Sequence, residues 1–427
     1  MSSAIRQVSS ATGGNVASSE PLQNDSDSPL AGIRVVAIGA FVAGNVCPLV
    51  LAELGADVIK VESLKRPEAL RSYYSPDHPR IFEPSGVQTT AMFSCLTRSM
   101  RSVCIEVDQP GGADTVQSLA QSADILIENM GPGVVERWGC SFAQLAASNP
   151  LLVMLSISGY GRTGPRGGYR AYGSSISNYL GLASAWAPDP VHFDFVAAYH
   201  GAAVAVAAYQ LAQSTGAGTY LDLSQVETGT AVMAPLYLDS LVNNQPWSEG
   251  PNEVPGAVLS TVVRCTGHDA WAAVELEDAD DVRVLAGVME RPDLVPSTFD
   301  DALRLAPHVE EALGSWAMSR TPMQVSIILQ HAGLAVAPVQ STEDLWRDPQ
   351  LRARGAFVEI DHPDIGLLEQ PQSPDRMTLT PGHVRGRSRR LGEDTFTVLQ
   401  DWLGLRETDL QALRAAGAIY QVPDNDC

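Results

Sequence analysis

The sequence predicts an α/β protein: a Rossmann-like large domain, with a parallel sheet and helices on both faces, and a smaller α+β domain. The chain has 427 residues, which is more than one ordinary domain needs. Apolar residues make up 45% and charged residues 18%, as is typical of globular proteins. From Leu30 onward, short apolar runs alternate with helical ones. This alternation indicates crossover connections between parallel strands.

The predicted elements follow that alternation. Strands are expected at 33–38, 57–61, 102–107, 123–128 and 151–157, and helices at 44–54, 111–121 and 141–147. A long Ala-rich helix at 196–213 then precedes a strand at 219–223 and a helix at 225–242. The smaller part has expected strands at 258–265 and 270–274 and helices at 280–289, 310–317 and 323–330. Loops are expected from Gly333 until helices at 395–403 and 408–415.

These elements divide the chain into segments. Residues 1–29 are rich in Ser, Asn, Asp and Gly, which predicts a disordered leader. Residues 30–225 are the first part of the large domain, and 226–332 form the smaller α+β domain with its linkers. Residues 333–427 form a loop-rich final segment.

Composition excludes several classes of function. Lys and Arg number 28 against 49 Asp and Glu, and the resulting net charge of −21 opposes general binding to nucleic acid or to an anionic membrane. The stretch 196–212 is interrupted by polar residues, so we expect a buried helix and no membrane span.

The cysteines indicate a reducing compartment. The six of them are scattered, with no C-x-x-C pair and no His at zinc-ligand spacing, so neither a metal site nor a disulfide framework is expected. The first 29 residues contain no continuous apolar core, which argues against a secretory signal. We therefore expect a cytoplasmic protein.

A ligand site is expected beyond the carboxyl ends of the strands, where helix N-termini also point. The segments there are Gly39–Asn45, Glu62–Arg71, Asn129–Gly133 and Ser158–Gly173, and the last is the most glycine-rich of the chain. The familiar phosphate and hydrolase signatures are absent: no G-x-x-x-x-G-K-[ST] and no G-x-S-x-G occur, and Gly39 to Gly44 has the wrong spacing for a dinucleotide fingerprint.

Several stretches resemble landmarks of the class III CoA-transferases, the family that includes formyl-CoA and carnitine CoA-transferases and α-methylacyl-CoA racemase. They occur in family order and are 30–36, 54–62, 123–129, 156–161 with Gly164-Pro165, 222–227, 332–339 and 348–355. The resemblance covers residues 30 to 419.

The resemblance implies an architecture and a reaction. It implies a large domain built from both chain ends, so that 333–427 returns to complete it, and two subunits threaded through each other as interlocked rings. Family enzymes move CoA between carboxylic acids, with coenzyme A or acyl-CoA as co-substrate and no metal. An aspartate attacks the acyl-CoA carbonyl, and an enzyme-bound anhydride and free thiolate form. Backbone N–H groups of glycine-rich loops stabilise the oxyanions.

The sequence departs from the family pattern where the nucleophile is expected. After the Gly-Pro pair the chain reads Arg170-Ala171-Tyr172-Gly173, so Gly173 stands at the position of the aspartate. Met100 and Gly131 replace a Lys and an Arg of the family pattern. These losses remove charges that would face the phosphates of CoA.

Three hypotheses follow from this departure. The chain is a CoA-transferase subunit, in an interlocked homodimer or in a heterodimer whose paralogous partner supplies the aspartate. Alternatively, it is self-sufficient and uses Asp194, although a structural carboxylate capping the following helix is the stronger interpretation of that residue. The third hypothesis is a non-catalytic acyl-CoA binder.

The resemblance also suggests residues for ligand binding. Arg71 and Arg101 are predicted to contact CoA phosphates, with solvated surface arginines as the equally weighted alternative. Gly161, Gly164 and Pro165 are predicted to shape the loop over the acyl group. Glu128 orients neighbouring backbone or caps a helix.

Overall fold

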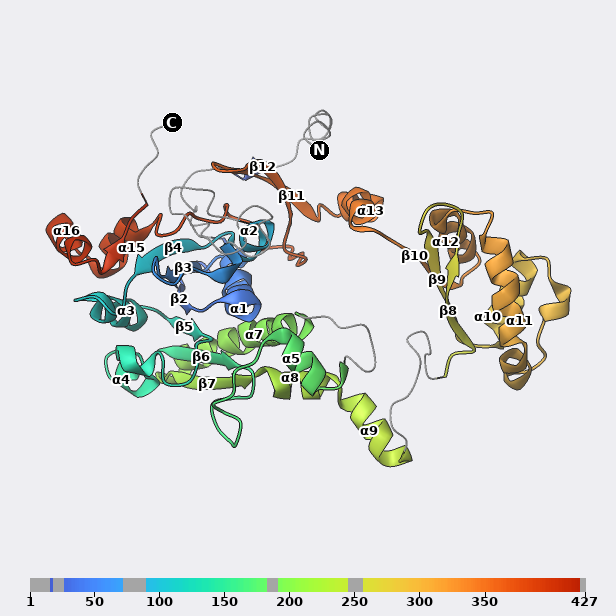
Figure 1. Cartoon of the computed structure of the whole chain (residues 1–427), viewed down its shortest axis with the longest axis horizontal. Helices are drawn as coiled ribbons and strands as arrows, with labels where there is room; N and C mark the ends of the chain where they lie inside the picture. The colour runs from blue at the N-terminus through green and yellow to red at the C-terminus, as the bar shows by residue number, and fades with distance from the viewer. Residues whose placement is uncertain (1–15, 18–26, 72–89, 183–190, 245–255, 423–427) are drawn as a thin grey trace. The chain divides into compact units, whose positions relative to one another are not determined.

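A seven-stranded sheet forms the centre of one compact unit of the protein (Figure 1). The computed structural model describes residues 16–17, 27–71, 90–182, 191–244 and 256–422. The strand order is β13 (Ile419–Tyr420), β4 (Arg101–Ile105), β3 (Asp57–Glu62), β2 (Arg34–Ile38), β5 (Ile125–Glu128), β6 (Val153–Ser158) and β7 (Thr219–Ser224). All neighbours pair parallel except β13, which is antiparallel to β4. The predicted parallel sheet is confirmed.

Helices cover both faces of this sheet (Figure 1). Alternation along the strands divides the core: Val35 packs with α1 (Phe41–Glu53) and α7 (His192–Thr215), and Val36 packs with α3 (Gly112–Gln121) and α15 (Thr395–Leu403). The remaining helices of this unit are α2 (Ala91–Thr97), α4 (Phe142–Ala146), α5 (Gly173–Tyr179), α8 (Gln225–Val232) and α16 (Glu407–Ala415).

Helix α7 is long and apolar enough to cross a membrane by length and composition alone. Its buried residues are nearly all Ala and Gly, and they let the helix lie close to α1 and to the sheet. A Cβ at Gly201 would stand 3.2 Å from side-chain atoms of Leu155 and Leu223. This close approach to the sheet identifies α7 as a core helix.

A second unit, mainly Pro235–Leu351, has its own antiparallel sheet. The sheet has the order β10 (Ala335–Val339), β9 (Trp271–Leu276) and β8 (Leu259–Arg264). Helices α10 (Ala279–Val288), α11 (Phe299–Ala317) and α12 (Pro322–His331) pack on it and bury Val274, Leu285 and Leu313. Helices α9 (Ala234–Asn243) and α13 (Thr342–Arg347) also belong to this part of the chain.

The structure shows more regular elements after Gly333 than the loops predicted there. Besides β10 and α13, the chain forms α14 (Pro349–Ala353), β11 (Phe357–His362) and the antiparallel β12 (Gly366–Pro371). Strand β1 (Val16–Ala17), which lies within the predicted leader, pairs parallel with β11. Residues 1–15 and 18–26 of that leader lie outside the described residues.

The final segment joins the first unit, which comprises Met1–Leu180, Pro188–Ala234 and Arg352–Cys427. The boundaries between the two units, at 234/235 and 351/352, differ from the predicted 225/226 and 332/333. Arg385 connects it to α1: the guanidinium donates to the carbonyl of Ala52 at 2.9 Å, to that of Gly55 at 3.3 Å and to that of Ala56. These carbonyls lie at the C-terminus of α1, where a cation is favoured.

Candidate functional site

Three loops meet at the carboxyl edge of the central sheet. They follow β2, β5 and β6, and the third runs from Gly159 to Tyr172 before α5 begins. Asn129 joins the first two: the N–H of Ala40 donates to its Oδ1 at 2.9 Å, and its Nδ2 donates to the carbonyl of Ala40 at 2.8 Å. A Cβ at Gly39 or Gly44 would stand 2.7 or 2.6 Å from the Asn129 amide. These two glycines therefore make room for an amide side chain.

The buried Lys60 also contacts the loop that follows β2. Lys60 Nζ donates to the carbonyl of Gly39 and to Asn45 Oδ1, both at 2.7 Å, and pairs with Glu68 at 3.1 Å. The other oxygen of Glu68 accepts the N–H of Phe41 at 3.0 Å. Phe41 has φ +59°, a left-handed conformation that is rare for a residue with a bulky side chain. The Lys60–Glu68 pair thus fixes a strained residue at the site.

An acid–arginine–acid cluster anchors the glycine-rich loop. Strand register places Glu128, Ser156 and Asp222 side by side across β5, β6 and β7. The N–H of Arg162 donates to both carboxylate oxygens of Asp222 at 3.0 Å, and its guanidinium pairs with Glu128. Burial raises the pKa of Glu128, and the charge of Arg162 opposes that rise. The cluster joins the start of the loop to two strands.

The predicted loop residues lie at this edge. Gly161 has φ +81°, and a Cβ there would lie 3.6 Å from Ser224. Gly164 has φ +77° with open space around it, and Pro165 is exposed. A Cβ at Gly159 would collide with that of Ala171 at 2.4 Å, so the two ends of the loop touch. The assignment of Gly161, Gly164 and Pro165 to the acyl group stays a prediction.

Gly173 is the buried first residue of α5, at the end of the same loop. The ring of its neighbour Tyr172 packs edge-to-face on Phe41 with centroids 5.4 Å apart. The strained residue held by Lys60 and Glu68 therefore lies beside the position that the resemblance assigns to the nucleophile.

Asp194 lies in the first turn of α7, where a negative charge is favoured. Its Oδ1 accepts Gln225 Nε2 at 2.6 Å, which ties α7 to the start of α8. The prediction that Asp194 caps this helix is wrong, because the helix begins at His192 and Val191 is the N-cap residue.

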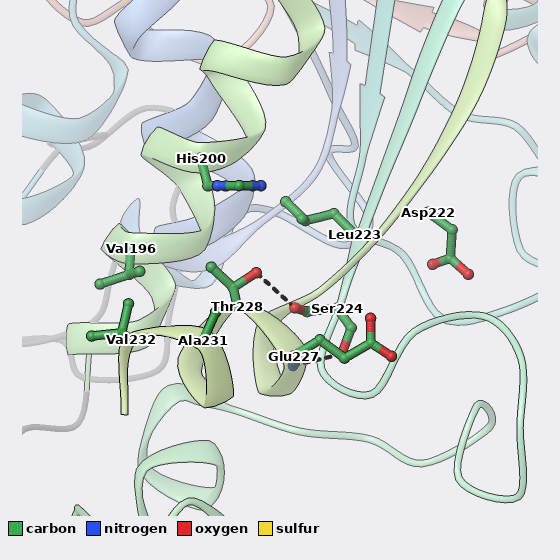
Figure 2. Close-up of a pocket in the computed structure, with 9 residues that line it drawn as sticks. All are labelled: Val196, His200, Asp222, Leu223, Ser224, Glu227, Thr228, Ala231 and Val232. Carbon is green, nitrogen blue, oxygen red and sulfur yellow. Dashed lines mark hydrogen bonds between the residues drawn. The ribbon is translucent and has the colours of Figure 1, made fainter. Parts of the chain in front are cut away.

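A pocket opens beside the glycine-rich loop between α7, the end of β7 and α8 (Figure 2). It has a volume of about 590 Å³, within the range of small-molecule sites. Its wall includes Val196, Leu223, Ala231 and Val232, with His200 on one side and the carboxylates of Asp222 and Glu227 on the other (Figure 2). The glycine-rich loop meets the pocket at Ser224, a lining residue whose hydroxyl donates to the carbonyl of Gly159 at 3.4 Å.

The two predicted phosphate contacts are both held in ion pairs. Arg71 is buried, with its Nε and Nη2 donating to Glu62 at 2.9 and 2.7 Å. Arg101 begins β4 and pairs with Asp57, the first residue of β3, at the amino edge of the sheet. The structure therefore does not bring Arg101 together with Gly161, and the phosphate-binding roles of both arginines stay predictions.

The segments expected at the site contain Glu68, Asn129 and Arg162, but sequence reasoning did not predict the contacts that these residues and Lys60 make there. Their contacts join residues up to 89 positions apart, which no local pattern reveals. The sequence did contain one signal that the loop after β6 is part of a site: four of the eleven tyrosines fall between 160 and 179. In the described part of the chain, no group of three or more His, Cys, Asp or Glu is arranged to hold a metal ion.

Comparison with known proteins identifies the family. A family model for CoA-transferase family III matches residues 30–395. The chain is 30% identical over 410 residues to the β subunit of the succinyl-CoA–L-malate CoA-transferase of Chloroflexus aurantiacus, covering 92% of this chain and 98% of that protein. It is 31% identical over 410 residues to the α subunit from that organism, covering 91% and 92%. The chain belongs to CoA-transferase family III.

Two further relatives agree with this assignment. The family III chain is 26% identical to the formyl-CoA:oxalate CoA-transferase of Rhodopseudomonas palustris, covering 91% of this chain and 97% of that protein. Its fold matches a crystal structure of a CAIB/BAIF family protein from Brucella suis with a TM-score of 0.75 at 22% identity, covering 88% and 100%. Membership of CoA-transferase family III implies CoA thioesters as substrates.

Proposed function

We propose that this chain is a subunit of a cytoplasmic class III CoA-transferase that moves CoA between an acyl-CoA, such as succinyl-CoA, and a carboxylic acid. A paralogous partner, interlocked with it, supplies the attacking aspartate. One observation carries the proposal: Gly173, which has no side chain to attack with, is the first residue of α5 at the carboxyl edge.

The chemistry explains why this residue matters. A carboxylate oxygen attacks the thioester carbonyl, the C–S bond breaks, and the thiolate of CoA leaves with the electron pair. The thiolate then attacks the aspartyl carbonyl of the anhydride, releases the first acid, and the second acid reverses these steps. A subunit without the carboxylate can supply binding surface and oxyanion-stabilising N–H groups, but it cannot form the anhydride.

Two carboxylates close to the loop, those of Glu128 and Asp222, are engaged in structural contacts. Glu128 pairs with Arg162, and both oxygens of Asp222 accept the N–H of Arg162. These contacts anchor the loop, so using either group as a nucleophile would release it. The relatives that are α and β subunits of one transferase support a two-subunit arrangement.

The test compares the chain alone with the chain plus the product of a neighbouring paralogous gene. CoA exchange is measured among succinyl-CoA, acetyl-CoA and a panel of carboxylic acids. We expect exchange only with the partner present, and full activity of the chain alone would refute the proposal. Gly173→Asp is expected to give the chain alone a hydroxylamine-sensitive acyl adduct, and Gly173→Asn, of equal bulk, is the control.

A self-sufficient enzyme that uses Asp194 is the alternative. Its carboxylate lies on α7, which packs against α5. If the chain is active alone, Asp194→Ala must abolish that activity. Tight CoA binding with no exchange under any of these conditions would indicate a non-catalytic acyl-CoA binder.

A further inference from the structure

The glycine-rich loop and α5 carry an unusual concentration of exposed aromatic rings. Tyr160 is at the centre: its ring packs edge-to-face on Tyr169, with centroids 5.9 Å apart, and on Tyr179, with centroids 5.3 Å apart. Tyr169 is 61% exposed and Tyr179 is 49% exposed. Tyrosine rings of a folded chain usually bury most of their apolar surface, so the exposed surface of these two residues can contact a ligand.

An arginine accompanies the rings. The guanidinium of Arg166 stands 5.5 Å from the centroid of Tyr179, and its Nη1 donates to the hydroxyl of that tyrosine at 3.1 Å. Arg166 is exposed, and no carboxylate among the described residues forms an ion pair with it. This differs from Arg71 and Arg101, whose guanidinium groups are paired with carboxylates. The cluster thus combines π faces with a cation that has donors left for an anion.

We propose that Tyr160, Tyr169, Tyr179 and Arg166 form a binding site for a planar aromatic ring carried by a carboxylic acid. The ring stacks on the exposed tyrosine faces, and Arg166 donates to the carboxylate or to another acidic group of the same molecule. Such a site is sequence-local, because the loop and the first helix after it supply all four residues.

The position of the cluster assigns the ring to the acyl group. Tyr179 lies six residues after Gly173 in α5, which is about 9 Å along the helix axis. The adenine ring of CoA lies at the opposite end of that molecule from its thioester, so a ring bound near Gly173 belongs to the acid. This step rests on the proposed function, in which acyl transfer occurs at the edge that Gly173 occupies.

Direct binding to the purified full chain tests the inference without any turnover. The probes are 3-phenylpropionate and its saturated counterpart 3-cyclohexylpropionate, which has the same carboxylate and similar bulk but no π face. Isothermal titration calorimetry is expected to show about five-fold tighter binding of 3-phenylpropionate. Equal affinity for the two acids, or no binding of either, would overturn the proposal.

Matched variants locate the site. Tyr169→Leu with Tyr179→Leu is expected to remove the preference for the aromatic acid, and Tyr169→Phe with Tyr179→Phe is expected to keep it. Tyr199→Leu on α7, where the tyrosine is also 50% exposed, is the control and should change nothing. Unchanged melting temperatures show that each variant is folded. Retention of the preference in the double leucine variant would refute the assignment.

A titration with a nucleotide tests whether the tyrosine cluster binds the adenine ring of CoA instead of a ring of the acid. Adenosine 3′,5′-bisphosphate is titrated against the chain and against the double leucine variant. Ring-dependent binding of this nucleotide would transfer the site to the adenine end of CoA and overturn the acyl assignment. None of these titrations needs catalysis. A negative result in them therefore does not affect the partner-dependent CoA exchange assay. If that exchange assay fails, ring binding can still be measured.

Discussion

Charged side chains in two regions of the first unit have opposite environments. Around β3 and β4, Lys60, Arg71, Arg98 and Arg101 are each paired with a carboxylate, and their side chains are 1–13% exposed. In the glycine-rich loop, by contrast, Arg166 and Arg170, which follow the paired Arg162, are exposed beside exposed tyrosines. The difference teaches that residue type alone does not identify a ligand contact, because a neutralised buried cation has a structural role already.

The largest expected effect comes from breaking a buried pair of the first region. Arg71→Met leaves Glu62 buried without the cation that, together with Lys60, lowers its pKa against the effect of burial. We expect a loss of about 3–5 kcal/mol in the free energy of unfolding, measured by urea denaturation.

The control for Arg71→Met is the exposed pair of Lys65 with Asp108. Lys65→Met should leave the free energy of unfolding nearly unchanged, because solvent screens an exposed ion pair. If the two variants lose equal stability, the buried pairs are not structural and the contrast between the regions fails.

The anchor of the open loop is expected to show a smaller and more local effect. Arg162→Met removes the pair with Glu128 but keeps the backbone contact with Asp222, so we expect a loss of about 1.5–3 kcal/mol. Hydrogen exchange should accelerate in residues 159–171 and remain unchanged in α3. Uniform acceleration over the whole unit would show that Arg162 supports the global fold instead of the loop.

Two glycines of the carboxyl edge are expected to respond differently to one methyl group. A Cβ at Gly44 would lie 2.6–2.8 Å from the amide of Asn129, whereas at Gly131 the nearest atom is Val134 Cγ2 at 3.9 Å. Gly44→Ala should cost about 1–3 kcal/mol and Gly131→Ala less than about 0.5 kcal/mol. Thermal denaturation compares them, and equal losses would contradict the Asn129 contact.

A pH dependence is expected within the final segment. Burial lowers the pKa of His362 to about 4, helped by the charge of Arg387, and the N–H of Asp364 donates to its Nδ1 at 3.2 Å. Between pH 6.5 and about 4 the unfolded chain binds more protons than the folded one, so the contribution of this residue to stability is lost as pH falls. The melting temperature of His362→Gln should fall less over this interval than that of the unaltered protein. Parallel curves would show that other groups control the acid transition.

Local patterns predicted much of the fold. Apolar runs bounded by glycines predicted β2, β3, β5 and β6 to within a few residues of their observed ends. Parallel strands are buried on both faces, so their sequences are continuous apolar segments. The predicted helix at 225–242 is instead two helices, α8 and α9, since the chain turns at Met233. Strands β11 and β12 were missed, because each contains few apolar residues: Phe357, Val358 and Ile360 in β11, and the adjacent Leu367 and Leu368 in β12.

Sequence by itself determined that the chain lacks a carboxylate at residue 173, that its loop after β6 is rich in Gly and Tyr, and that its family order of motifs is intact. Only the tertiary structure decided which cations are free. Whether an arginine meets Glu62, Asp57 or solvent depends on strand order and on the final segment returning over the sheet. Those contacts join residues 9 positions apart for Arg71 and Glu62, 44 for Arg101 and Asp57, and 318 for Arg71 and Arg389. Charge pairing is a property of distance in space, and local sequence carries no record of that distance.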